Sequence, residues 1–113
     1  MPVLKVFFDG ALEGRLREAS QSLLQDLQSA LTESLNADPA KCQVMFVPCL
    51  ASAPLPVYVD LQFRQSPARD ATVVAAAMQR VATVLGKALA VGLRIRAFDI
   101  DQTQLHALDQ DAP

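Results

Sequence analysis

The chain consists of two similar halves, and each half is predicted to fold as a βαβ unit. Both halves open with Pro-Val before a strand, at Pro2-Val3 and again at Pro56-Val57. A helical crossover between two strands favours a parallel pair, with the helix packed on the sheet. We therefore predict an α+β domain with the order βαββαβ, in which two helices cover one face of a four-stranded sheet and the other face is bare.

Hydrophobic periodicity marks the expected elements. Strands show β-branched and aromatic residues or period-two alternation, and helices show leucines, or alanines and valines, at helical spacing. Asp70 is the expected N-cap of the second helix, and Gly86 is expected to end it. The strands are predicted at 2–8, 42–47, 57–63 and 93–98 and the helices at 13–35 and 70–86, in a single domain 1–113 made of a first half 1–49, a second half 56–100 and a polar tail 101–113.

Length and hydropathy limit the class of protein. At 113 residues the chain has the length of one domain, and its apolar content of 51% is high for that size. Some apolar surface is therefore expected to be covered by other subunits. The longest apolar runs are broken by charge, and the amino terminus has no basic region followed by an apolar signal core. We expect a cytoplasmic protein that makes no contact with a membrane.

Charge and cysteine content disfavour other classes. The net charge of −2 argues against nucleic-acid binding, as do the sparse aromatic residues. Cys42, Cys49 and His106 suggest neither a disulfide framework nor a metal site. We expect no cofactor. The charge is nevertheless unevenly placed, because the stretch 64–96 carries six basic residues and one acid.

Pro2 is the candidate catalytic residue. Removal of Met1 would turn it into a free secondary amine, and an α-amino group has a reference pKa of about 7.7–8.0. A low-dielectric site or nearby cations lower the pKa of such an amine toward the range in which a general base works best. If Met1 stays attached, the nitrogen is an amide and cannot act as a base. The alternative interpretation is that Pro2 merely starts an edge strand.

Four segments together resemble the tautomerase superfamily, which includes macrophage migration inhibitory factor, 4-oxalocrotonate tautomerase and 5-(carboxymethyl)-2-hydroxymuconate isomerase. The resemblance covers residues 2 to about 100. It implies a homotrimer whose sheets line an inner barrel, and an amino-terminal proline that moves a proton between oxygen and carbon of a 2-oxo acid or its enol. The four segments are Pro2 before the first strand, Leu12-Glu13-Gly14-Arg15, Val44-Met45-Phe46-Val47-Pro48, and Leu93-Arg94-Ile95-Arg96-Ala97-Phe98-Asp99.

Arginine is the residue best suited to hold the substrate carboxylate in such a reaction, through bidentate hydrogen bonds. The resemblance makes Arg64 the first candidate, because the end of the third strand borders the proline pocket in that family. It makes Arg94 and Arg96 the next candidates, since their strand contributes to a pocket shared between subunits. Each of these arginines can equally be a solvated or ion-paired surface residue.

Three further residues complete the set of substrate-binding candidates. Arg15 matches the arginine of a Leu-Glu-Gly-Arg stretch that binds substrate in 4-oxalocrotonate tautomerase. Lys5 is a weaker candidate, and Phe98 shares one side of the last strand with the two arginines there. A pocket with this many cations suits a dicarboxylate or another multiply anionic substrate.

The sequence leaves two other functions open. The same βαββαβ order occurs in ferredoxin-like domains, so the chain can be a ligand-binding module without catalysis. It can also be a tautomerase-like trimer that has no turnover, because fold alone does not establish activity.

Overall fold

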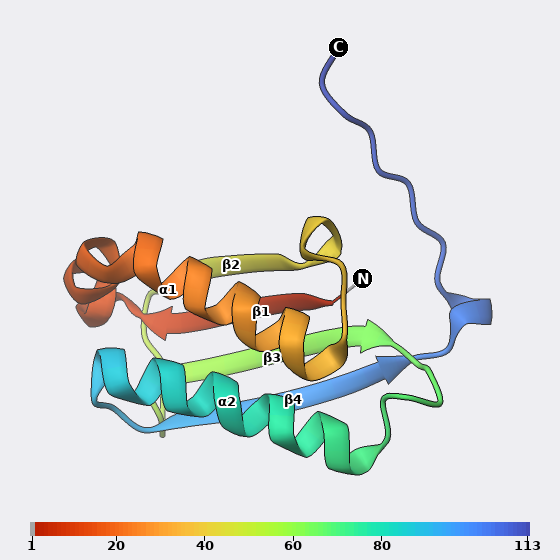
Figure 1. The fold of residues 1–113 in the computed structure, drawn as a ribbon. Coiled ribbons are helices and arrows are strands. Elements are labelled where there is room, and N and C mark those ends of the chain that lie inside the picture. Colours follow the sequence, from red (N-terminus) through yellow and green to blue (C-terminus); the bar gives the residue numbers. More distant parts are fainter. Residues whose placement is uncertain (1) are drawn as a thin grey trace.

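A computed structural model describes residues 2–113 and contains one four-stranded sheet with both helices on the same face (Figure 1). The predicted sequence of strands and helices is confirmed. Single helical turns at Gly10–Leu12, Pro39–Lys41 and Gln102–Gln104 lie in the connections. The main elements are β1 (Val3–Asp9), α1 (Glu13–Leu35), β2 (Gln43–Cys49), β3 (Val57–Arg64), α2 (Ala71–Leu89) and β4 (Leu93–Ile100).

The strand order is β2-β1-β3-β4. β1 is parallel to β2, β3 is parallel to β4, and the central pair of β1 and β3 is antiparallel. Each helix therefore connects two strands that are direct neighbours in the sheet. In the split βαβ units of ferredoxin-like domains another strand lies between them, so the ferredoxin-like alternative is wrong.

The two halves meet along β1 and β3, where Leu4 pairs with Leu61 and Phe8 with Val57. Because this pair is antiparallel, β1 begins at the end of the sheet at which β3 and β4 finish. The end of α1 and the start of α2 lie at the same end of the sheet (Figure 1). We call this end the Pro2 end of the sheet, and we call the opposite end of the strands the Asp9 end.

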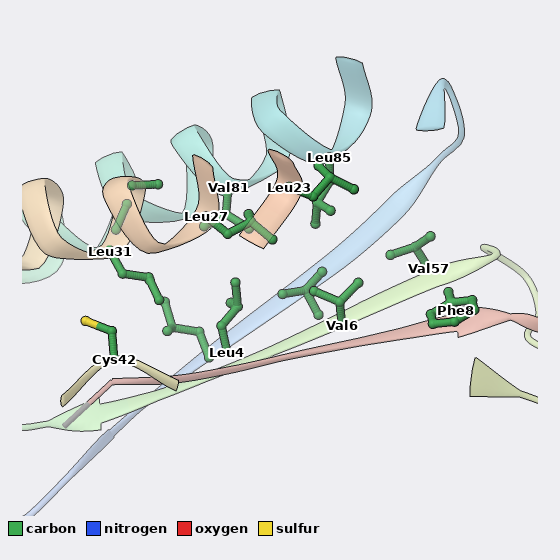
Figure 2. Packing of buried hydrophobic residues seen from close by; sticks show 14 of the residues in the cluster. Leu4, Val6, Phe8, Leu23, Leu27, Leu31, Cys42, Val57, Val81 and Leu85 are labelled. Atoms are coloured by element: carbon green, nitrogen blue, oxygen red, sulfur yellow. The ribbon is translucent and has the colours of Figure 1, made fainter. Parts of the chain in front are cut away.

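The core lies between the helices and the sheet (Figure 2). Leu4, Val6 and Phe8 alternate with half-buried residues along β1, as expected of a strand with one covered face. Leu27 and Val81 are fully buried and place one side of each helix in this layer. The other face of the sheet, which we call the open face, is covered by no helix of the described residues 2–113 (Figure 1).

The ends of the helices show how local sequence sets their length. α1 has the predicted bounds and closes at Asn36, whose φ of 50° is left-handed. Asp70 caps α2 as predicted, because its side chain accepts a hydrogen bond from the backbone N–H of Val73 at 3.0 Å. The predicted end of α2 at Gly86 is wrong. The helix continues to Leu89 because that residue adds one more turn to the buried stripe.

The outer strands are longer than predicted. β2 runs through Pro48 to Cys49, although the prediction ended it before the proline. β2 is an edge strand, where a residue without an N–H is tolerated. β4 extends to Ile100, and β1 begins at Val3, one residue later than predicted.

α2 is long and apolar enough to cross a membrane by length and composition, with a mean hydropathy of 1.2 over its most apolar stretch. The sequence-based estimate of short, charge-broken apolar runs did not anticipate this. In the fold, Ala77, Val81 and Leu85 on α2 are fully buried in the protein core. A core helix of a soluble domain meets the same criteria, so α2 is weak evidence for a membrane span.

Candidate functional site

Pro2 lies at the start of the central strand β1, and its side chain is fully buried. Its carbonyl oxygen accepts a hydrogen bond from the backbone N–H of Gln43 at 3.0 Å, which joins it to the start of β2. The β1–β3 register pairs Val3 with Gln62, so one step further it places Pro2 beside Phe63. The backbone of Pro2 is thus held between two neighbouring strands. The predicted removal of Met1 concerns a residue outside the described range.

Arg64 is the last residue of β3 and lies at the Pro2 end, as predicted. Its Nε is buried and has no hydrogen-bond partner within residues 2–113. Strand alternation groups Arg64 with Gln62 on the open face, whereas Pro2 is grouped with Leu4 on the covered face. The two residues share one end of the sheet but start from opposite faces.

Arg69, which was not among the predicted site residues, is fixed at the same end. Its Nε donates to the carbonyl oxygen of Leu35 at 3.2 Å, and its Nη1 donates to the carbonyl oxygen of Arg64 at 3.1 Å. Its guanidinium carbon also lies 6.0 Å from the ring centre of Phe63, within range of a cation–π contact. The sequence shows it only as the single arginine in the loop between β3 and the Asp70 cap.

A cavity of about 270 Å³ opens at the Pro2 end. Its walls come from the end of α1, the β3–α2 loop and the turn after β4, and include Asn36, Arg64, Arg69 and Gln102. None of the described residues that line it is acidic. The cavity therefore offers cationic and amide groups, which suit a small anion.

The open face holds the candidates from β1 and β4 in rows across the strands. Phe98 pairs with Gln62, which pairs with Val3, so Phe98 lies in the row that includes the start of β1, and the pair Arg64–Ile100 lies one row nearer the Pro2 end. It is 47% exposed. Its exposure leaves an aromatic surface on β4, separated from the start of β1 by β3.

The next row of the open face contains charged residues. Asp60 pairs with Lys5 on one side and with Arg96 on the other. The Oδ1 of Asp60 is buried and has no hydrogen-bond partner in the described chain, while Arg96 donates to the carbonyl oxygen of Ile95 at 2.9 Å. Arg94 lies one row further toward the Asp9 end, opposite Tyr58. Lys5, Arg94 and Arg96 are therefore displaced from Pro2 within one protomer.

Arg15 lies at the Asp9 end, at the first turn of α1. Its Nη1 donates a hydrogen bond to the carbonyl oxygen of Leu89, the last residue of α2. The structure thus separates Arg15 from Pro2 by the length of the sheet within a protomer. The remaining basic residues of the 64–96 stretch, Arg80 and Lys87, lie on α2. Arg80 forms an ion pair with Glu33 at 2.8 Å.

Two carboxylates with lowered pKa values flank the sheet. The pKa of Asp9 is lowered by hydrogen bonds from the backbone N–H groups of Ala11 and Ser52. The pKa of Asp101, at the Pro2 end, is lowered by the backbone N–H and the hydroxyl of Thr103. Asp101 is held by a local turn, and Asp9 by a local turn and by Ser52, which is 43 positions away in the sequence. The lowered pKa keeps both acids ionised near neutral pH.

The sheet topology and the solved structures that share it define the fold class: the chain has the fold of the tautomerase superfamily. A fused 4-OT from a symmetric trimer matches with a TM-score of 0.77 and 18% identity, over 93% of this chain and 90% of that one. A macrophage migration inhibitory factor-like protein from Entamoeba histolytica matches with a TM-score of 0.73 and 9% identity, over 94% of each chain.

A member of the cis-3-chloroacrylic acid dehalogenase family matches with a TM-score of 0.76 and 14% identity, over 98% of this chain and 83% of that one. No family model matches the sequence, and no curated protein matches it. At these identities the likeness concerns the fold, and it confirms the fold that the sequence resemblance implies.

Proposed function

We propose that the chain is a tautomerase that moves a proton between oxygen and carbon of a small 2-oxo acid or its enol, with Pro2 as acid and base. The observation that carries this proposal is the place of Pro2, which precedes the central strand at the same end of the sheet as Arg64 and Arg69. Its ring is fully buried. A buried site favours the neutral form of an amine, and this is the form that accepts a proton.

Arg64 is proposed to bind the substrate carboxylate and to stabilise the negative charge that develops on the enol oxygen. Its buried Nε has no partner within the described residues, so a ligand oxygen can supply one. A guanidinium binds a carboxylate through two parallel hydrogen bonds, which fixes the orientation of the substrate as well as its position. The proposed substrate class is a small 2-oxo acid or an unsaturated dicarboxylate, each of which carries such a carboxylate.

The active form is proposed to be a homotrimer that covers the open face. That face carries Val3, Phe7 and the exposed Phe98 beside its charged row, and such a mixed surface suits contact with further copies of the chain. One solved structure of similar fold is described as a symmetric trimer. In such an assembly Arg94 and Arg96 are proposed to approach the Pro2 of a neighbouring subunit. We propose a cytoplasmic location.

The test combines mass, assembly and activity. Intact mass is expected to show loss of Met1, and sedimentation is expected to show a trimer. The purified protein is expected to ketonise phenylenolpyruvate or 2-hydroxymuconate, and Pro2→Ala is expected to abolish this. Pro56→Ala is the matched control, because Pro56 opens the second half with the same Pro-Val pair. Undiminished activity of Pro2→Ala would exclude Pro2 as the catalytic base.

A processed trimer that is inactive toward both enols would favour the other interpretation, a tautomerase fold without turnover. A protein that retains Met1 would have the same consequence for Pro2. These results are independent of whether the arginines bind an anion.

A further inference from the structure

We infer that Arg69 is a positioning residue: it ties the end of β3 to the end of α1 and so sets where Arg64 lies beside Pro2. The catalytic consequence of this inference rests on the proposed function. The structural part stands on the contacts of Arg69 alone. Nothing in the sequence pattern marks this residue, because its partners belong to two other elements.

The guanidinium of Arg69 bridges two backbone carbonyls that come from different halves of the chain. Leu35, which accepts from Nε, is the last residue of α1, and Arg64, which accepts from Nη1, is the last residue of β3. The final carbonyls of a helix have no partner within the helix, and a cation there also meets the negative end of the helix dipole. Arg69 thus satisfies one end of α1 and one end of β3 with a single planar group.

The position of the guanidinium is further restricted by the ring of Phe63, 6.0 Å away. Phe63 is the residue that the β1–β3 register places beside Pro2. Arg69 therefore contacts the backbone of Arg64 and the side chain next to Pro2 at the same time. A displacement of Arg69 is expected to change the relative placement of the two groups that the reaction needs.

Arg69 acts through Arg64 in this scheme, since its own donors point to backbone carbonyls. Lysine at position 69 keeps the positive charge but lacks the planar fork that reaches both carbonyls. Arg69→Lys is thus expected to preserve the charge at the end of α1 while it releases the end of β3. This variant separates positioning from charge.

The first measurement needs no activity. The buried Nε–H of Arg64 is expected to exchange slowly with solvent, and ¹⁵N-detected exchange of the arginine Nε–H signals at mildly acidic pH reports it. Arg69→Lys is expected to accelerate that exchange. Arg80→Lys is the matched control, because Arg80 binds Glu33 on the helical layer and makes no contact with Arg64.

The second measurement uses the enol substrates. Arg69→Lys is expected to raise KM about tenfold with a smaller change in kcat, because a slightly misplaced carboxylate ligand weakens substrate binding first. The same change in an Arg64→Lys background is expected to add little, since coupled residues give non-additive effects. If Arg69 had a purely structural role, Arg69→Lys would change KM and kcat by the same factors in the wild type and in the Arg64→Lys background.

Unchanged Arg64 exchange in a folded Arg69→Lys protein would overturn the inference, whatever the chemistry. If the wild type has no activity, the proposed function fails and the exchange measurement alone decides the positioning role. If Arg69→Lys does not fold, Arg69→Gln, whose side chain can still reach one carbonyl, takes its place in both measurements.

Discussion

The Nη1 of Arg15 donates a hydrogen bond to the carbonyl oxygen of Leu89 at 2.9 Å. The contact ties the first turn of α1 to the last turn of α2 at the Asp9 end of the sheet. The carbonyl of Leu89 lacks an intrahelical partner because the helix ends there. Within one protomer Arg15 therefore has a structural role, while the substrate-binding role implied by the Leu-Glu-Gly-Arg resemblance stays a prediction.

Replacing Arg15 by alanine is expected to destabilise the fold. The change removes a part-buried hydrogen bond from a charged donor, and the expected loss in the free energy of unfolding is about 1 kcal/mol. Urea unfolding is expected to show a lower midpoint with an unchanged slope. Arg17→Ala is the control, because Arg17 makes only an exposed contact with Glu13 at 3.7 Å and its loss is expected to cost less than about 0.5 kcal/mol. Equal effects of the two variants would contradict this assignment.

Gly86→Ala is expected to stabilise the protein. Gly86 lies inside α2, and a Cβ at this position would meet no atom within 4 Å. Alanine in a helix interior is favoured over glycine by roughly 0.5–1 kcal/mol, so the melting temperature is expected to rise. Gly92→Ala is the comparison, since a Cβ there would lie 2.9 Å from Cδ2 of Leu55. An equal gain in both variants would refute the explanation from helix propensity and free space.

The stabilising effect of Asp9 is expected to depend on pH. Its pKa is lowered in the folded protein by the N–H groups of Ala11 and Ser52, so its ionised form is favoured by folding. A lowered folded-state pKa gives a stability that is complete above the ordinary value of 3.8 and is lost as pH falls through the folded-state pKa. Asp9→Asn is therefore expected to be less stable than wild type near neutral pH.

The difference in stability between wild type and Asp9→Asn is expected to narrow in strongly acidic solution, where both proteins carry an uncharged side chain at this position. Urea unfolding of both proteins across the acidic range measures it. Asp111→Asn in the exposed tail is the control and is expected to match wild type throughout. A deficit of Asp9→Asn that stays constant with pH would show that the carboxylate charge is not its cause.

The sequence predicted the elements well where local signals agree. α1 has the predicted bounds because a leucine stripe, a 3.6-residue period and Asn36 all mark the same helix. Gly86 and Pro48 were misleading, since both residues are ordinarily found at the ends of elements. The first lies in a helix whose buried stripe continues to Leu89, and the second lies on an edge strand where an absent N–H costs little.

The site was less predictable because its contacts are long-range. Arg64 was a candidate because the resemblance pointed to the end of a strand that the sequence marks clearly, and its role in binding stays a prediction. Arg69 was not, because its contact with Leu35 joins residues 34 positions apart and depends on how α1 packs beside β3. The carboxylate oxygen of Asp60 that has no partner within residues 2–113 likewise follows from its place in the middle of an open sheet face, which periodicity alone does not give.

Neutralising Asp60 is expected to weaken self-association. Asp60 is the acid in the middle of the open face, paired across the strands with Lys5 and Arg96. Its removal leaves the cations of that face without a central counter-charge, and faces of like charge repel when they are brought together. Asp60→Asn is therefore expected to shift the protein from the proposed trimer toward monomer, as measured by sedimentation velocity over a range of concentrations.

If charge repulsion causes this effect, a second substitution and added salt are both expected to reduce it. Adding Lys5→Gln to Asp60→Asn removes one of the uncompensated cations and is expected to restore part of the association. The effect of Asp60→Asn is also expected to diminish at high salt, because salt screens exposed charges. Asp109→Asn controls for net charge, since Asp109 lies in the exposed tail and contacts only Lys41 there, at 3.9 Å. Asp60→Asn that assembles like wild type at low salt would mean that the open face does not meet another copy through this charged row.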